Sequence, residues 1–235
     1  MKRIISIFSV FLLSIVVTKS QTNYGDINAT DFLTIGLGGS IGYSMATNTP
    51  PTGLKVSPKF GTQFGLDLIM PFSRMLSGGL SIGLDNRATG IFENSDNNNT
   101  INNQLNYISI FPFLKISTLI IGVNFGLPKS GKFTVNRTSA SEISTDYSDE
   151  DVKSVDMMIE PRLGAVAPLL DEEIGWLGLT FSLGYCINKI YKENQTGALV
   201  ALTNLDKKFD GNLASAHLGL TWQFRIPGVE RSRKY

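Results

Sequence analysis

A small set of ionisable residues lies at positions where several of them could act together. Each sits in a segment in which apolar and polar residues alternate, and each falls on the polar side: Asp67, Asp85, Glu160, Arg162 and His217. Paired carboxylates can exchange protons as general acid and base, or line a path for protons or ions. Because an unpaired buried charge is costly, such groups inside a narrow fold more often neutralise one another. We therefore expect a structural network of salt bridges and hydrogen bonds, with Arg87 as a further candidate member.

His217 raises the question of catalysis because Ser215 precedes it on the same face of its segment. A serine hydrolase that acts on membrane lipids needs its serine, histidine and acid on the surface that meets the lipid. The alternation places both side chains inside instead, and the chain has no second histidine. We expect His217 to be an interior hydrogen-bonding residue and the protein to have no catalytic site.

Two further features could carry chemistry. The acidic run Asp146–Asp151 offers oxygen ligands of the kind that calcium prefers, but it lacks the ligand spacing and the glycine of a calcium-binding loop. We interpret it as a solvated acidic loop. Cys186 is the one cysteine, which excludes an intramolecular disulfide, and its apolar segment favours a small packed side chain. No metal and no cofactor are expected.

The overall charge excludes one large class of partners. The chain of 235 residues has a formal net charge of +1 and no basic stripe interleaved with aromatic residues, so nucleic-acid binding is not expected. Charged residues make up 17% of the sequence, against 42% hydrophobic residues and 23 glycines. That balance is unusual for a soluble domain and suits a wall that is wet on one side and apolar on the other.

The elements that must position these residues are strands, because apolar and polar residues alternate with a period of two. About eight such segments of roughly ten residues each follow one another. They are 33–43, 60–70, 79–85, 105–115, 121–127, 155–165, 177–185 and 214–224. Residues 105–115 are apolar almost throughout, so the facing of their side chains stays open.

The connections between these segments alternate in length. Three are short, at 71–76, 116–118 and 168–176, and four are long and polar, at 44–58, 86–104, 128–154 and 188–212. A transmembrane barrel has this rhythm, with tight periplasmic turns and longer extracellular loops. The pattern predicts a closed antiparallel up-and-down transmembrane β-barrel, all-β, with both termini in the periplasm.

The composition of the two faces indicates which one meets lipid. In most segments one face carries Leu, Ile, Phe and other aromatic residues with almost no charge, and the other carries Gly, Ser, Thr and isolated charges. Backbone amides in hydrocarbon must all be paired, so a sheet there has to close, with apolar side chains outside. The alternative is a secreted soluble barrel of the lipocalin kind, in which the apolar face lines a ligand cavity.

The first residues have the layout of a secretory signal peptide. Lys2 and Arg3 precede an apolar stretch that ends near Val17, and small residues lead to an expected cleavage between Ser20 and Gln21. We therefore predict four parts. They are a signal peptide at 1–20, a periplasmic lead at 21–30, a barrel domain at 31–224 and a basic periplasmic tail at 225–235.

Two stretches resemble small eight-stranded outer-membrane β-barrels, including the porin-like barrels common in Bacteroidetes and related bacteria. Residues 105–115 followed by 122–126 resemble the middle strand pair of that family. The closing stretch resembles its aromatic-ending last strand, which the barrel-assembly machinery reads, through Leu218, Leu220, Trp222 and Phe224. The chain departs from the pattern by continuing past Phe224. The resemblance covers 31–224 and implies a barrel in the outer membrane of a Gram-negative bacterium, inserted by that machinery and embedded in its bilayer. It implies no reaction.

The functional hypothesis that follows is a non-enzymatic outer-membrane barrel with a structural or surface-interaction role through its four long loops. Two alternatives stay open. One is the lipocalin-like carrier of an apolar ligand, and the other is a lipid-modifying enzyme that uses Ser215 and His217.

Overall fold

The computed structural model describes residues 32–47, 54–73, 75–94, 100–137, 140–172, 174–190 and 212–230. The predicted signal peptide with Ser20 and Gln21, the lead at 21–30 and the last residues of the tail lie outside the described part. Among the described residues, no helix is long and apolar enough to cross a membrane.

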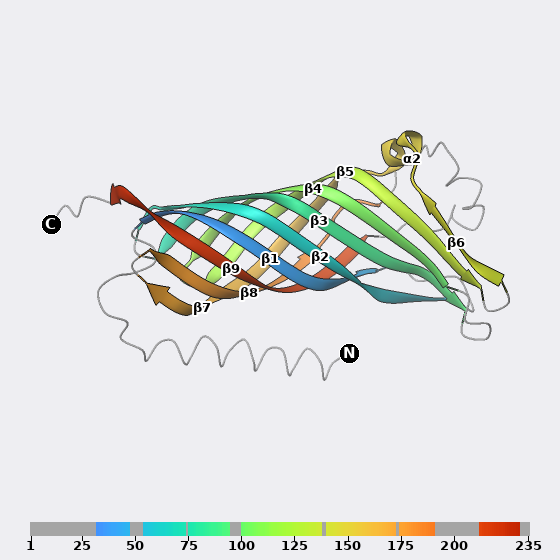
Figure 1. The fold of residues 1–235 in the computed structure, drawn as a ribbon, viewed down its shortest axis with the longest axis horizontal. Helices are drawn as coiled ribbons and strands as arrows, with labels where there is room; N and C mark the ends of the chain where they lie inside the picture. Colours follow the sequence, from blue (N-terminus) through green and yellow to red (C-terminus); the bar gives the residue numbers. More distant parts are fainter. Residues whose placement is uncertain are drawn as a thin grey trace.

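The described residues form nine strands and one short helix (Figure 1). The strands are β1 (Phe32–Ala46), β2 (Leu54–Pro71), β3 (Leu76–Asn94), β4 (Thr100–Ile116), β5 (Leu119–Arg137), β6 (Ala140–Asp146), β7 (Met158–Glu172), β8 (Gly175–Tyr185) and β9 (Leu213–Glu230), and the helix is α2 (Asp149–Ser154).

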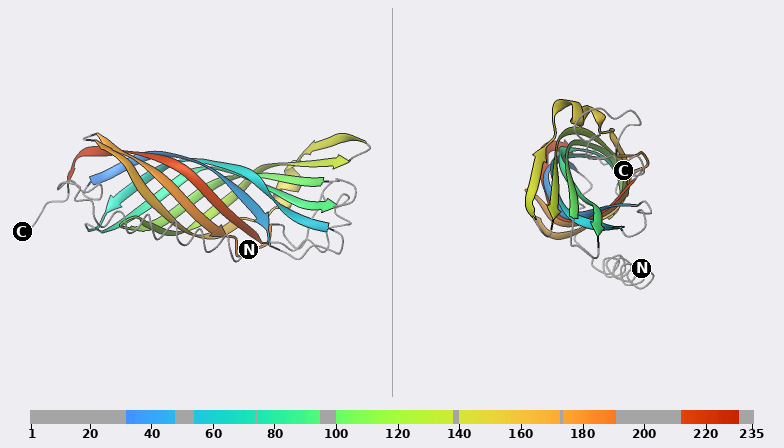
Figure 2. Two further views of the ribbon diagram at one scale, coloured as in Figure 1. Left: turned by 90° about the horizontal axis from the view of Figure 1, so that it is seen from below. Right: turned by 90° about the vertical axis from the view of Figure 1, so that its right-hand side faces the viewer.

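The sheet closes on itself. Each ring strand pairs antiparallel with the next in the order β1, β2, β3, β4, β5, β7, β8, β9, and β9 pairs back with β1. The end-on view in Figure 2 shows the resulting ring. β6 stands outside it and pairs with the distal part of β5. The predicted closed antiparallel barrel of eight strands is therefore confirmed.

Side chains alternate between the outside and the interior of the ring. On β9, Leu220 is 50% exposed and Thr221 is 5% exposed. The same alternation resolves 105–115, whose facing the sequence left open. Its inward residues are Leu105, Tyr107, Ser109, Phe113 and Lys115, and its exposed outward residues include Ile108 and Leu114.

Glycine makes room for large side chains inside the ring. A Cβ on Gly36 would clash with the side chain of Gln223, and one on Gly79 would clash with the ring of Phe113. A ring of eight strands leaves just enough space for its side chains, so a bulky inward residue needs a glycine beside it.

The two ends of the barrel differ as expected, but the long connections contain more structure than predicted. The tight turns and both described chain ends lie at one end, here called the turn end. The strand ends that border the long connections lie at the other, the loop end (Figure 1). At the loop end, β3 runs to Asn94, β4 starts at Thr100 and β5 runs to Arg137, so the loops expected at 86–104 and 128–154 are largely strand. Beyond the apolar belt, a hairpin keeps its backbone hydrogen bonds but has no apolar face. Strands were predicted from alternating apolar residues, so these extensions gave no signal in the sequence.

The predicted strand at 155–165 starts too early. The Ser148 side chain accepts a hydrogen bond from the Asp151 amide while the Asp151 side chain accepts one from the Ser148 amide, which forms a capping box. This box starts α2 inside the acidic run, Val155 follows as the C-cap, and β7 begins at Met158.

The last strand extends past the expected end of the barrel. β9 reaches Glu230, which pairs with Phe32, so the boundary at Phe224 between barrel and tail falls inside a strand. Arg225 also forms an ion pair with Asp171 and donates to the backbone oxygen of Glu172. These contacts fix the start of the predicted tail to β7.

The residues on the outer surface indicate whether water or lipid surrounds the barrel. Its exposed large apolar residues come from every ring strand and include Leu37, Phe64, Ile82, Leu183 and Trp222. The buried polar residues face inward. A lipocalin-like carrier requires the opposite arrangement, and a closed antiparallel sheet with an apolar exterior is the architecture of outer-membrane proteins. The chain is therefore an outer-membrane β-barrel.

The first prediction tests the outer face. Leu220→Arg should cost about 2–4 kcal/mol of folding free energy if the residue lies near the bilayer midplane, because a cation would face hydrocarbon. Denaturant titrations in lipid vesicles would measure the loss, with Leu220→Ala as the size control. A Leu220→Arg variant that folds as well as the parent would mean that this face meets water.

Candidate functional site

Four charged side chains form one cluster across the middle of the barrel. Asp85 and Arg87 come from β3, and Glu160 and Arg162 come from β7. Arg87 Nε lies 2.7 Å from Asp85 Oδ1, and Arg87 Nη2 lies 2.9 Å from Glu160 Oε2. Arg162 Nε lies 2.6 Å from Glu160 Oε2, and Arg162 Nη2 lies 2.8 Å from Asp85 Oδ2. Each arginine therefore bridges both carboxylates, and we call these four residues the ionic cluster.

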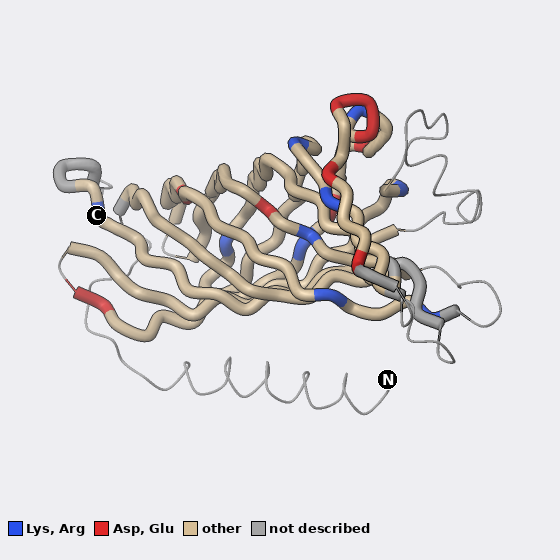
Figure 3. Tube along the Cα trace, turned by 45° about the vertical axis from the view of Figure 1, so that its right-hand side comes forward, with Lys and Arg blue, Asp and Glu red and all other residues tan. Residues whose placement is uncertain are grey.

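The ionic cluster is withdrawn from solvent. Its members are between 0% and 5% exposed. Figure 3 shows how sparse charged residues are along the ring strands. The cluster holds two carboxylates and two guanidinium groups, so its formal charges cancel. Cancellation matters because a single buried charge left without its partner is strongly destabilising.

Neutral side chains from other strands complete the network. Ser215 Oγ on β9 donates to Glu160 Oε1 at 2.6 Å, and Arg162 Nη1 donates to Gln63 Oε1 on β2 at 3.0 Å. Asn124 Nδ2 on β5 approaches Asp85 Oδ2 and Glu160 Oε2 at 3.4 and 3.5 Å. Ser109 Oγ on β4 donates to Asn124 Oδ1 at 2.5 Å. The network thus joins strands from all around the ring.

One of the predicted interior residues, Asp67, lies apart from this cluster. Asp67 Oδ2 accepts hydrogen bonds from Thr221 Oγ1 at 3.3 Å and from Gln223 Nε2 at 3.0 Å. A cavity of about 120 Å³ lies between this group and the ionic cluster, and its lining includes Asp67, Arg162 and His217. The structure therefore brings Asp85, Glu160 and Arg162 together and leaves Asp67 in a second group.

His217 is 4% exposed, and neither of its ring nitrogens has a hydrogen-bond partner among the described residues. Ser215 Oγ donates its hydrogen bond to Glu160 rather than to His217. A serine nucleophile requires a hydrogen bond to its base. The described geometry therefore forms no Ser215–His217 pair of the kind that the lipid-modifying hypothesis requires.

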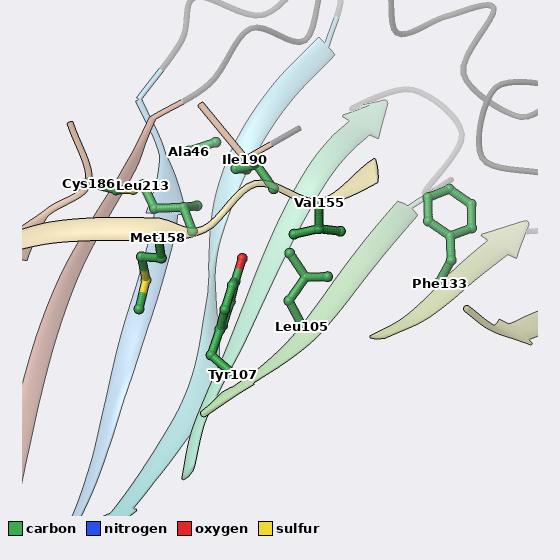
Figure 4. Close-up of a cluster of buried hydrophobic side chains, with 9 residues drawn as sticks. All are labelled: Ala46, Leu105, Tyr107, Phe133, Val155, Met158, Cys186, Ile190 and Leu213. Carbon is green, nitrogen blue, oxygen red and sulfur yellow. The ribbon is translucent and has the colours of Figure 1, made fainter. Parts of the chain in front are cut away.

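An apolar cluster closes the interior toward the loop end (Figure 4). Tyr107 and Leu105 lie directly opposite Asp85 and Arg87 in the β3–β4 register, so the cluster begins beside the charges. Its buried members are Ala46, Leu105, Tyr107, Phe133, Val155, Met158, Cys186, Ile190 and Leu213. Cys186 packs here as a small side chain, and its thiol lies 3.0 Å from Asn188 Oδ1.

The turn end of the interior is filled by a different pairing. Lys115 Nζ lies 4.7 Å from the centroid of the Trp176 ring, which is 3% exposed. Such a cation–aromatic contact gains strength where water is excluded. Together with the ionic cluster and the apolar cluster, it fills the described interior except for the cavity of about 120 Å³ beside Asp67.

The acidic run Asp146–Asp151 is built into local structure. Ser148 and Asp151 form the capping box of α2. Asp149 and Glu150 are exposed in its first turn, where their negative charges interact favourably with the helix dipole. Among the described residues, no group of three or more His, Cys, Asp or Glu side chains is arranged to hold a metal ion.

Some of these residues escaped the sequence analysis. Asn124 and Ser109 were not singled out, although both fall on the inward side of their strands. Neutral amides and hydroxyls carry no signal in a search for charges. The position of Asn124 on the polar side of segment 121–127 was the available indication, whereas the facing of Ser109 was open.

Comparison with known proteins finds distant similarity to solved structures. No protein-family model and no curated protein matches the sequence. Among solved structures, Ail, the attachment invasion locus protein of Yersinia pestis, is 14% identical with a TM-score of 0.42, and the match covers 82% of this chain and 99% of that one. Neisserial surface protein A is 8% identical, with a TM-score of 0.37 and coverage of 82% and 97%. The outer membrane protein OprG from Pseudomonas aeruginosa is 12% identical, with a TM-score of 0.34 and coverage of 86% and 100%.

The second prediction concerns the charge balance of the ionic cluster. Arg162→Met should lower the free energy of unfolding by about 3–5 kcal/mol, because Asp85 and Glu160 would then share one arginine in a buried site. Adding Asp85→Asn restores neutrality and should recover part of the loss. Denaturant titrations in vesicles would compare both variants with the parent. An unchanged stability of the single variant would show that the cluster is hydrated and weakly coupled.

Proposed function

We propose that this chain is a non-enzymatic, non-conducting outer-membrane barrel that presents its loop end to partners outside the cell. One observation carries the proposal: the interior is occupied by the ionic and apolar clusters, while β5, β6 and α2 project beyond the ring (Figure 1). The membrane-spanning part of the barrel is closed to solutes, and β5, β6 and α2 lie where partners outside the cell would bind.

The interior contacts support the non-conducting half of the proposal. The two arginines of the ionic cluster each contact carboxylates on both β3 and β7, so the cluster bridges the lumen from wall to wall. Tyr107 and Met158 are at most 2% exposed, so their side chains are closed off from water in the interior toward the loop end. A porin needs a polar lumen filled with water, which requires more strands than this ring has.

The projecting elements support the surface-interaction half. The described side chains of β6 from Glu142 to Asp146 are all exposed, and they include Ser144 and Thr145. A polar strand of this kind adds nothing to a lipid-facing wall. Loops and strand extensions placed on a rigid barrel are positions where binding residues are commonly found.

The orientation and the assembly partner belong to the same proposal. We place the tight turns and both chain ends in the periplasm and the long connections outside, because transmembrane barrels carry their long loops on the cell surface. We also propose that the barrel-assembly machinery reads β9 through its outward residues Leu218, Leu220, Trp222 and Phe224, which are 41–50% exposed. Stacking of Trp222 on Phe224, with ring centroids 5.7 Å apart, presents them as one aromatic surface.

The third prediction concerns conductance. The purified protein in planar bilayers should form no large, stable channel, because the ionic cluster and the apolar cluster both block the lumen. A known porin reconstituted in the same lipid is the control. A steady large conductance would mean that the interior opens or that an oligomer forms the pore, and the non-conducting proposal would be wrong.

The fourth prediction concerns the projecting hairpin. Replacing residues 134–144 with an Asn-Gly turn should leave the ring folded, because β5 pairs with β7 through Leu119–Gly126 and would keep most of its pairing with β4. Cells carrying this variant should lose most of whatever surface attachment or cell–cell aggregation the parent confers. Heat-modifiable mobility in gels would check the fold. Equal attachment by both proteins would contradict a role for this hairpin.

A further inference from the structure

β6 is a sheet edge. Of the nine described strands, it alone pairs with a single neighbour, β5, through a register that runs from Lys132 opposite Asp146 to Arg137 opposite Ala140. The views in Figure 2 show this strand at the margin of the projecting sheet. Half of the backbone N–H and C=O groups of an edge strand point away from its partner and can pair with another strand. Within the described ranges, no element pairs with that side of β6.

The side chains of β6 are sorted by face. Ile143 lies opposite Val135, and Val135 packs against the apolar cluster, so Ile143 belongs to the apolar side of the sheet and is 53% exposed. Glu142, Ser144 and Asp146 occupy the alternate positions and therefore share the other face. The edge thus offers an apolar position on one face and two carboxylates on the other.

The acidic character continues past the strand. Asp149 and Glu150 follow in the first turn of α2, and both are exposed. Figure 3 shows the acidic residues gathered over α2 and the neighbouring strand. None of the ion pairs described above engages Glu142, Asp146, Asp149 or Glu150. Lys132, opposite Asp146, offsets only part of this charge.

Charge selects between the occupants that could add to this edge. A second copy of the chain would bring another Glu142 and Asp146 against the first pair, and like charges on edge strands oppose such self-pairing. A strand with basic residues at alternate positions would instead place them beside these carboxylates. Its intervening residues would lie on the face of Ile143, where apolar side chains fit.

We propose that the free edge of β6 binds an extended segment of a partner protein in which basic and apolar residues alternate. The segment adds a strand to the projecting sheet: its backbone pairs with β6, its basic side chains meet Glu142 and Asp146, and its apolar side chains cover Ile143. This inference rests on the proposed surface-interaction function and names the kind of partner that the surface fits.

The experiment uses the full barrel in neutral detergent micelles and a fluorescent peptide of alternating lysine and valine. Anisotropy should report saturable binding, and amide hydrogen exchange of β6 should slow at least about tenfold on binding, because its free amides become paired. The same peptide with a central proline should bind much more weakly, since proline removes a backbone donor. A peptide of alternating glutamate and valine should not bind.

Matched variants separate this edge from general attraction. The double change Glu142→Lys and Asp146→Lys should weaken binding of the lysine peptide at least about tenfold and let the glutamate peptide bind, because the charge of the edge is reversed. Glu172→Lys, an exposed change of the same kind at the turn end, should leave binding unchanged.

Each contrary outcome is informative. Equal binding of the proline peptide would overturn strand addition and leave only charge attraction. Concentration-dependent dimers with slowed exchange in β6 would make a second copy the occupant. A barrel that retains hairpin-dependent attachment in cells but ignores the lysine peptide would refute this inference alone and leave the proposed function standing.

Discussion

Every backbone amide within hydrocarbon needs a partner, and the architecture follows from that requirement. A strand of the ring can satisfy it only if it is paired on both sides, which is why β9 must return to β1. Closure then divides the side chains by parity into a set that meets lipid and a set that meets other side chains. Apolar residues on the outside and polar residues on the inside are two results of one constraint. Beyond the apolar belt the constraint relaxes, and there, within the described part of the chain, β6 pairs on one side only.

The interior must then accommodate the side chains that the alternation places inside the ring. A ring of eight strands has no room for a bulk-water channel, so inward charges have to neutralise one another at short range. Arg87 and Arg162 do so by bridging Asp85 and Glu160, and glycines such as Gly36 yield space to large neighbours. The same crowding that fills the lumen confines recognition to the loop end, where the sheet is free to project.

The sequence predicted those parts of the fold that depend on local alternation. Parity placed Leu220 outside and Asp85, Glu160 and Arg162 inside, since a side chain's face is set by its own strand. Parity does not predict which inward residues meet across the lumen, because that depends on the shear and tilt of the strands. For this reason Asp67 was predicted to join the other charged residues, from which it is separate. The extension of β5, the strand β6 and the capping box of α2 were missed for another reason. Their stability comes from hairpin pairing and from the Ser148–Asp151 contacts rather than from an apolar face.

The spacing within the ionic cluster has a consequence for how the chain enters the bilayer. Asp85 and Arg87 lie two positions apart on β3, and Glu160 and Arg162 lie two positions apart on β7, so each strand carries a carboxylate and a guanidinium on the same face. Each strand is therefore electroneutral at this depth before it meets the other. The two strands can approach the membrane as separate neutral units, and the cross-lumen bonds form only when the sheet curls shut. The stabilising cross-lumen bonds are therefore gained only at the last step of closure. A half-open ring lacks them, which favours cooperative assembly.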